Sequence, residues 1–178
     1  MGCKFESQSP AILNSITHSL SAELYKDGRR ISDIEDRINS FSDEDKKSGY
    51  IYILKSLSEK PEIKSIKNLY KIGYSKVSIE ERIKNAVIEP TYLMSQVSVV
   101  TAFECYNMNP QKLEQLLHRF FGKSCLSADV FDNEGKRHIP REWFIAPLEI
   151  IEQAIHFVLN GEIVRYKYDV DKQIIVER

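Results

Sequence analysis

The sequence predicts an α/β (α+β) protein in which a small mixed sheet is flanked by helices. Short runs rich in aromatic and β-branched residues, such as YIYIL at 50–54, are typical of strands. Between them lie segments with apolar residues at helical spacing, several of which begin with a capping signal. The 178 residues are 42% hydrophobic and 29% charged, a composition that argues against wholesale disorder and supports a core without disulfides.

Residues 1–45 are predicted to form a helical N-terminal appendage. Apolar side chains recur at helical spacing over 10–26, and an Asp-Gly pair ends that helix. A second helix is expected to begin at Ser32, whose side chain forms a capping box with Glu35. We expect this hairpin to dock on the domain, or to serve in homo-oligomer formation or in binding a partner protein.

The next segment, residues 49–147, is predicted to be the principal domain, and residues 148–178 to be a helix and strand extension packed on it. The first two strands are expected to pair as an antiparallel hairpin with a long loop. The expected strands are 50–54, 69–74, 96–106 and 138–146, with a terminal strand pair in 162–176 and a helix at 148–160.

Two further helices carry clear start signals. Ser78 and Glu81 form a capping box, and Asn109 precedes Pro110, the favoured first residue of a helix. The first of these helices is expected to run to Pro90. Its inward residues are predicted to be Ile79, Ile83, Ala86 and Val87.

The net charge of −1 conceals an uneven distribution along the chain. Residues 46–87 hold 10 Lys and Arg against 4 Asp and Glu, whereas both flanking segments are acidic. This basic segment is either a face that binds an anion, with Lys55, Lys64 and Lys67 as phosphate contacts, or a solvated lysine-rich loop. No apolar run approaches the roughly 20 residues of a membrane span, so we expect a cytoplasmic protein without a membrane partner.

Five polar residues lie beside apolar faces in the predicted elements. Alternation along the strands places Tyr52 and Lys71 on faces that could line one cleft. Arg82 flanks the apolar stripe of its helix. Glu114 and His118 are four residues apart and therefore share one side of a later helix.

With these residues in this order, the chain resembles the GIY-YIG nuclease superfamily, and most of all a phage- and bacteria-associated branch whose second motif reads K-I-G. The resemblance covers about residues 49–147. It rests on Tyr50-Ile51-Tyr52, Lys71-Ile72-Gly73, Arg82, Glu114 followed by His118, and the closing R-E-W-F at Arg141 to Phe144.

The resemblance implies a GIY-YIG-like fold and a divalent-metal-dependent DNA endonuclease, in a setting of phage defence, restriction or mobile elements. It assigns Glu114 as the ligand of Mg²⁺ or Mn²⁺ and Arg82 as the group that holds phosphate oxygens. Tyr52 is the implied general base, and Lys71 is the cation expected to help the phenol lose its proton. His118 is implied in proton shuttling or phosphate contact.

Two departures from that family leave alternatives open. Lys71 stands where many members have a tyrosine, and Tyr70 could fill that role if the strand register slips by one residue. Ala86 stands where many members have a histidine. The alternative function is a catalytically degenerate nucleic-acid-binding or adaptor module. Glu142 is expected either to pair with a nearby base or to support the site.

Overall fold

The computed structural model describes residues 2–5, 46–107 and 109–178. The helical hairpin expected at 10–26 and from Ser32 onward therefore lies outside the described residues.

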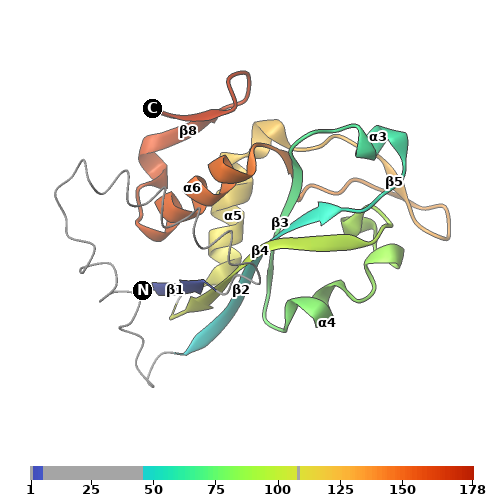
Figure 1. Cartoon of the computed structure of the whole chain (residues 1–178), viewed down its shortest axis with the longest axis horizontal. Helices are drawn as coiled ribbons and strands as arrows, with labels where there is room; N and C mark the ends of the chain where they lie inside the picture. Colours follow the sequence, from blue (N-terminus) through green and yellow to red (C-terminus); the bar gives the residue numbers. More distant parts are fainter. Residues whose placement is uncertain (1, 6–45, 108) are drawn as a thin grey trace.

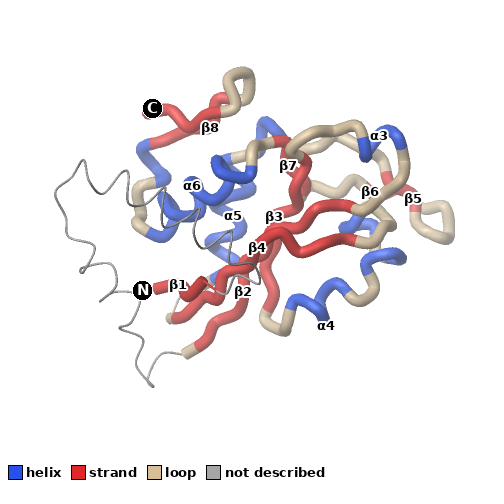
Figure 2. The backbone as a smooth tube through the Cα atoms, viewed as in Figure 1, coloured by secondary structure: helices blue, strands red, loops and turns tan. Residues whose placement is uncertain are grey.

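A five-stranded sheet forms the centre of the described chain, in the order β1-β4-β2-β3-β7 (Figures 1 and 2). Every neighbouring pair in it is antiparallel, including the β2–β3 hairpin that the sequence predicted. The α+β fold class is thus confirmed. The strands are β1 (Gly2–Phe5), β2 (Lys47–Ser56), β3 (Leu69–Ser75), β4 (Val97–Tyr106) and β7 (Trp143–Ile145).

Helices α5 (Pro110–Phe120) and α6 (Leu148–Leu159) cover one face of the sheet (Figure 1). The Asn109 side chain accepts a hydrogen bond from the backbone N–H of Lys112 at 3.0 Å, which confirms the predicted cap. The main core forms between these helices and the inward side chains of β2, β3 and β4. Its fully buried members include Ile51, Ile53, Ile72, Leu117, Phe121 and Ile151.

The opposite face carries α4 (Ile79–Ile83) and two short 3₁₀ turns, η1 (Ala86–Ile88) and η2 (Pro90–Tyr92). The Ser78 cap is confirmed, because its side chain accepts the backbone N–H of Glu81 at 3.3 Å. The expected extent of the helix is wrong: it stops at Ile83, and Val87 is 47% exposed. Glu89 precedes proline and is extended, and the neighbouring β-branched residues also disfavour a helix.

The predicted strand at 138–146 is in fact two strands in different sheets. His138 belongs to a small hairpin with residue 130, whereas Trp143 joins the main sheet beside β3. Pro140 lies between them and has no backbone N–H to donate. The terminal strand pair is confirmed. The remaining elements are α3 (Pro61–Lys64), η3 (Gly122–Ser124), β5 (Val130–Phe131), β6 (Arg137–His138), η4 (Ile163–Arg165), β8 (Tyr166–Asp169) and β9 (Ile174–Glu177).

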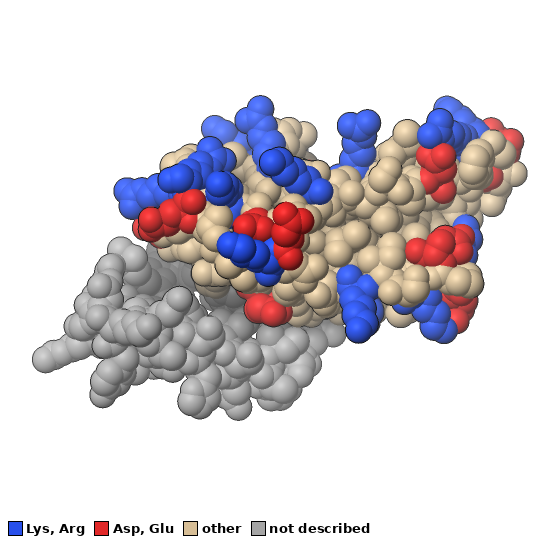
Figure 3. Space-filling model, turned by 90° about the horizontal axis from the view of Figure 1, so that it is seen from above, with Lys and Arg blue, Asp and Glu red and all other residues tan. Residues whose placement is uncertain are grey.

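Charged side chains of both signs lie over the face seen from above (Figure 3). Lys and Arg are most frequent along one edge of that face, with Asp and Glu beside them. Within the described ranges, no helix has both the length and the apolar character needed to cross a membrane.

Candidate active site

The candidate site lies at the edge of β3, where its pairing with β7 ends. β7 pairs with β3 through Lys71, and the N–H of Ile72 donates to the Glu142 carbonyl at 3.0 Å. Beyond that point two side chains of α5 contact the strand edge. The Glu114 carboxylate accepts the N–H of Tyr74 at 3.0 Å, and Nε2 of His118 lies 2.9 Å from the Ile72 carbonyl oxygen. Because a carbonyl only accepts, this contact places the His118 proton on Nε2.

Tyr52 lies across Gly73, its partner in the β2–β3 register. A Cβ atom at position 73 would stand 2.6 Å from the Tyr52 ring, so only glycine leaves room for the ring in this position. The Tyr52 side chain is buried, and burial raises the pKa of its phenol above the ordinary value near 10. The phenol therefore keeps its proton at neutral pH.

Lys71 lies on the same face as Tyr52, as the strand alternation predicted, and Tyr70 packs on the opposite face with the main core. The Lys71 side chain is fully buried. Its ammonium forms an ion pair with Glu142 and donates to the Thr91 hydroxyl at 3.1 Å. Thr91 in turn donates to the Glu142 carboxylate at 2.8 Å. Burial lowers the pKa of Lys71, and the nearby carboxylates of Glu114 and Glu89 oppose that effect. The carboxylate in direct contact with the ammonium is Glu142.

These contacts change the interpretation of the role of Lys71. Its ammonium is bound by Thr91 and Glu142, and the positive charge that lowers the pKa of Tyr52, against the larger effect of burial, is Arg82. Glu142 does pair with a nearby base, as one of the two sequence interpretations held. Lys71 thus joins β3 to the residue before β7 and to η2.

Arg82 reaches the site from α4 and is partly exposed. Its Nη1 atom lies 3.2 Å from a Glu89 carboxylate oxygen, and each of these side chains is about one third exposed. The Arg82 guanidinium lies 5.3 Å from the ring centre of Tyr92, and the Lys71 ammonium lies 5.2 Å from the same centre. Both distances fall in the range of cation–π contacts. The Tyr92 hydroxyl also donates to the Arg82 carbonyl at 3.3 Å.

All five residues selected from the sequence therefore lie around β3. The charges of Glu114 and Arg82 both act on Tyr52 and on Lys71. The sequence did not predict three further residues of the site, which lie in the segment around η2: Glu89, Thr91 and Tyr92. Pro90 was the only local signal there, and it indicated a helix end rather than a cluster of functional groups.

Glu114 is the residue with the chemistry of a metal ligand. Burial raises the pKa of its carboxyl, and the neighbouring positive charges, including Lys71 and Arg82, oppose that effect. Its second oxygen has no hydrogen-bond partner in the described part of the chain. No group of three or more His, Cys, Asp or Glu among the described residues is arranged to hold a metal. One carboxylate with a free oxygen still fits Mg²⁺, which binds one or two carboxylates and completes its shell with waters and substrate phosphates.

The chain matches the T5orf172 domain over residues 49–159, a span that contains every residue of the candidate site. It belongs to the T5orf172 domain family. This match overturns the resemblance drawn from the sequence, because T5orf172 is a different family from GIY-YIG. The resemblance rested on short motifs: two three-residue strand segments, the single residues Arg82, Glu114 and His118 after them, and the closing R-E-W-F at Arg141 to Phe144.

The T5orf172 domain is associated with nuclease-like and DNA-binding function, and membership by itself assigns no specific activity. The chain is also 42% identical over 154 residues to the uncharacterized protein YeeC of Bacillus subtilis (strain 168). That alignment covers 86% of this chain and 40% of YeeC, so the chain spans about two fifths of its relative's length. No solved structure matches the chain significantly.

Proposed function

We propose that this T5orf172 domain is a divalent-metal-dependent endonuclease that hydrolyses phosphodiester bonds in DNA. The observation that carries the proposal is the convergence of Glu114, Arg82 and Tyr52 at the edge of β3, from three different elements. A DNA phosphate is an anion, and its hydrolysis builds further charge on the phosphate oxygens. A cation, a carboxylate and a phenol are the groups that such a reaction uses.

Arg82 is the residue that binds the phosphate. Its guanidinium can hold two phosphate oxygens at once, which a lysine cannot do. In the free protein this group is paired with Glu89, so the phosphate has to take the place of the Glu89 carboxylate. Because both side chains are partly exposed, that exchange requires no opening of the core.

Glu114 would hold Mg²⁺ or Mn²⁺ through its free oxygen, and such an ion supplies Lewis-acid stabilisation of charge on the phosphate. Tyr52 retains its proton at neutral pH, so its phenol orients the attacking water by hydrogen bonding; removal of a proton by Tyr52 is confined to high pH. His118 donates from Nε2 to the Ile72 carbonyl, which leaves Nδ1 to accept a proton or, once protonated, to donate to a phosphate oxygen.

The decisive variant is Glu114→Gln. Glutamine keeps an oxygen that accepts the N–H of Tyr74 but loses the charge that a metal requires. We expect cleavage of plasmid DNA by the full chain, with Mg²⁺ or Mn²⁺ present, to fall by about 100-fold or more. Far-UV circular dichroism and the thermal transition should be unchanged.

The matched control is Glu134→Gln, which makes the same change at an exposed turn residue away from the site. This control should cleave normally. Full activity of Glu114→Gln at saturating Mg²⁺, with an unchanged thermal transition, would refute the metal-binding role.

A second candidate is a nucleic-acid-binding module without catalysis. It is favoured by the observation that Glu114 and His118 both satisfy backbone groups of an open strand edge, a purely structural task. On this alternative the wild-type chain binds DNA, with an affinity that falls as salt rises, and does not cut it with any divalent metal. Binding and cleavage measured on the same preparation separate the two functions.

A further inference from the structure

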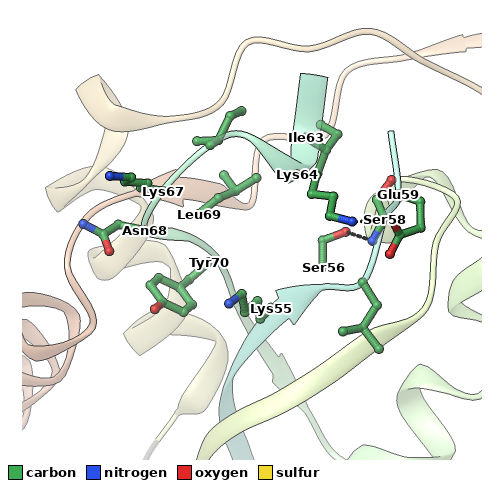
Figure 4. A pocket seen from close by; sticks show the side chains of 12 residues that line it. Lys55, Ser56, Ser58, Glu59, Ile63, Lys64, Lys67, Asn68, Leu69 and Tyr70 are labelled. Atoms are coloured by element: carbon green, nitrogen blue, oxygen red, sulfur yellow. Dashed lines mark hydrogen bonds and ion pairs between the residues drawn. The ribbon is translucent and has the colours of Figure 1, made fainter. Parts of the chain in front are cut away.

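A pocket of about 530 Å³ opens between the loop that carries α3 and the adjoining ends of β2 and β3 (Figure 4). None of the candidate active-site residues lines it. Its volume lies within the range of roughly 300–1,000 Å³ that is typical of small-molecule sites.

The pocket carries unpaired positive charge. Three lysines line it: Lys55, Lys64 and Lys67. The ammonium of Lys64 lies 2.5 Å from a Glu59 carboxylate oxygen and is neutralised by it. Lys55 and Lys67 are exposed and make no ion pair or hydrogen bond with the residues that the structure describes. Two lysines without an anionic partner among the described residues therefore line one pocket.

A flat ring and an amide lie on the same side of the pocket as Lys67. Figure 4 shows Tyr70 and Asn68 beside that lysine, with Lys55 between them and the serine side of the pocket. Tyr70 is partly exposed, so part of its ring is available to a second ring. The Asn68 side chain offers both a donor and an acceptor.

We propose that this pocket binds one nucleotide, with its phosphate on Lys55 and Lys67 and its base against Tyr70. The lysines select an anion, whereas the ring and the amide favour an anion that carries a planar heterocycle. The nucleotide comes either from solution or from a DNA strand. The inference goes beyond the proposed endonuclease function, because binding here requires neither metal nor cleavage.

The test uses the full wild-type chain with EDTA, so that no cleavage occurs, and isothermal titration calorimetry with dAMP as the probe. Lys55→Met and Lys67→Met should each weaken binding about tenfold, as expected for loss of one charged hydrogen bond. The control Lys136→Met removes an exposed charge in the turn between β5 and β6 and should have no effect. Inorganic phosphate lacks the base and deoxyadenosine lacks the phosphate, so each should bind at least tenfold more weakly than dAMP.

A labelled single-stranded oligonucleotide distinguishes the two sources. Binding of dAMP identifies a free nucleotide, whereas binding of the oligonucleotide alone, with the same lysine dependence, identifies a nucleotide within a strand. The proposal is overturned if neither probe binds, if Lys136→Met weakens binding as much as the pocket variants, or if inorganic phosphate binds as well as dAMP. Nucleotide binding without any DNA cleavage would support the pocket proposal and contradict the endonuclease proposal. DNA cleavage without nucleotide binding would support the endonuclease proposal and contradict the pocket proposal.

Discussion

Replacement of Gly73 by alanine tests whether the Tyr52 ring is held where the structure places it. The new methyl carbon would stand 2.6 Å from two ring carbons and the hydroxyl oxygen of Tyr52, well inside van der Waals contact. The ring cannot move away freely, because Tyr52 is 2% exposed and packs with Leu54, Ile79 and Tyr92. Either the ring or the strand has to shift.

Overpacking of this kind typically costs about 1–3 kcal/mol of folding free energy. For a chain of this length, each kcal/mol corresponds to roughly 2–4 °C in the thermal midpoint. We therefore expect Gly73→Ala to lower the midpoint by about 2–12 °C. Because the ring is displaced, DNA cleavage at a temperature where the variant is folded should fall as well.

The assay is thermal and urea unfolding followed by circular dichroism, with Gly122→Ala as the matched control. A Cβ atom at Gly122 meets no other atom within 4 Å, so the same substitution there should be close to neutral. In a Tyr52→Leu background, Gly73→Ala should cost less than it does in the wild type, since the ring it displaces is gone. Equal costs at the two glycines, or an equal cost in both backgrounds, would refute the reasoning.

Three further predictions concern the charges of the site. Lys71→Met should lower the free energy of unfolding by about 1–3 kcal/mol in urea titrations, which is less than for a fully buried pair because Glu142 is 39% exposed. Tyr70→Phe should change the free energy of unfolding by less than about 0.5 kcal/mol. A Lys71→Met chain as stable as the wild type would contradict a stabilising ion pair. Because burial raises the pKa of the metal-free Glu114 carboxyl, protons compete with the metal at a higher pH than for an ordinary glutamate. At sub-saturating Mg²⁺, cleavage should therefore begin to fall above the pH near 4.3 that is usual for glutamate, and a rate that stays constant down to that pH would count against it. Glu89→Gln frees the Arg82 guanidinium and should tighten DNA binding several-fold in fluorescence anisotropy, and weaker binding would show that the carboxylate positions the arginine instead.

The local parts of the fold were predictable because their signals are local. Ser78 and Asn109 cap their helices by hydrogen bonds to residues three positions on, and both partners are visible in the sequence. Alternation along the strands likewise placed Lys71 and Tyr52 on one face. The early end of α4 was missed because its apolar spacing continues through Val87, whereas the backbone leaves the helical conformation at Asn85 and a 3₁₀ turn follows.

The parts of the site that were missed depend on contacts between distant segments. Lys71 meets Thr91 across 20 residues and Glu142 across 71, and nothing in either local pattern specifies that β7 lies beside β3. The degree of burial of a side chain was also not predictable from the sequence. The sequence suggested Lys71 as a cation that activates Tyr52, whereas complete burial of Lys71 made a carboxylate partner within the protein, the partly exposed Glu142, necessary. Residue types could be selected from the sequence, but their partners could not.

The way in which α5 closes the edge of β3 also bears on solubility. An open strand edge offers unpaired N–H and C=O groups on which another chain can add as a further strand. In β3 the Ile72 carbonyl is occupied by His118 and the Tyr74 N–H by Glu114. The two side chains that block edge-to-edge polymerisation are thus also the two for which we propose a part in the reaction. Variants that truncate both should aggregate through β3 before they unfold, so a loss of DNA cleavage in such variants has to be separated from a loss of monomer.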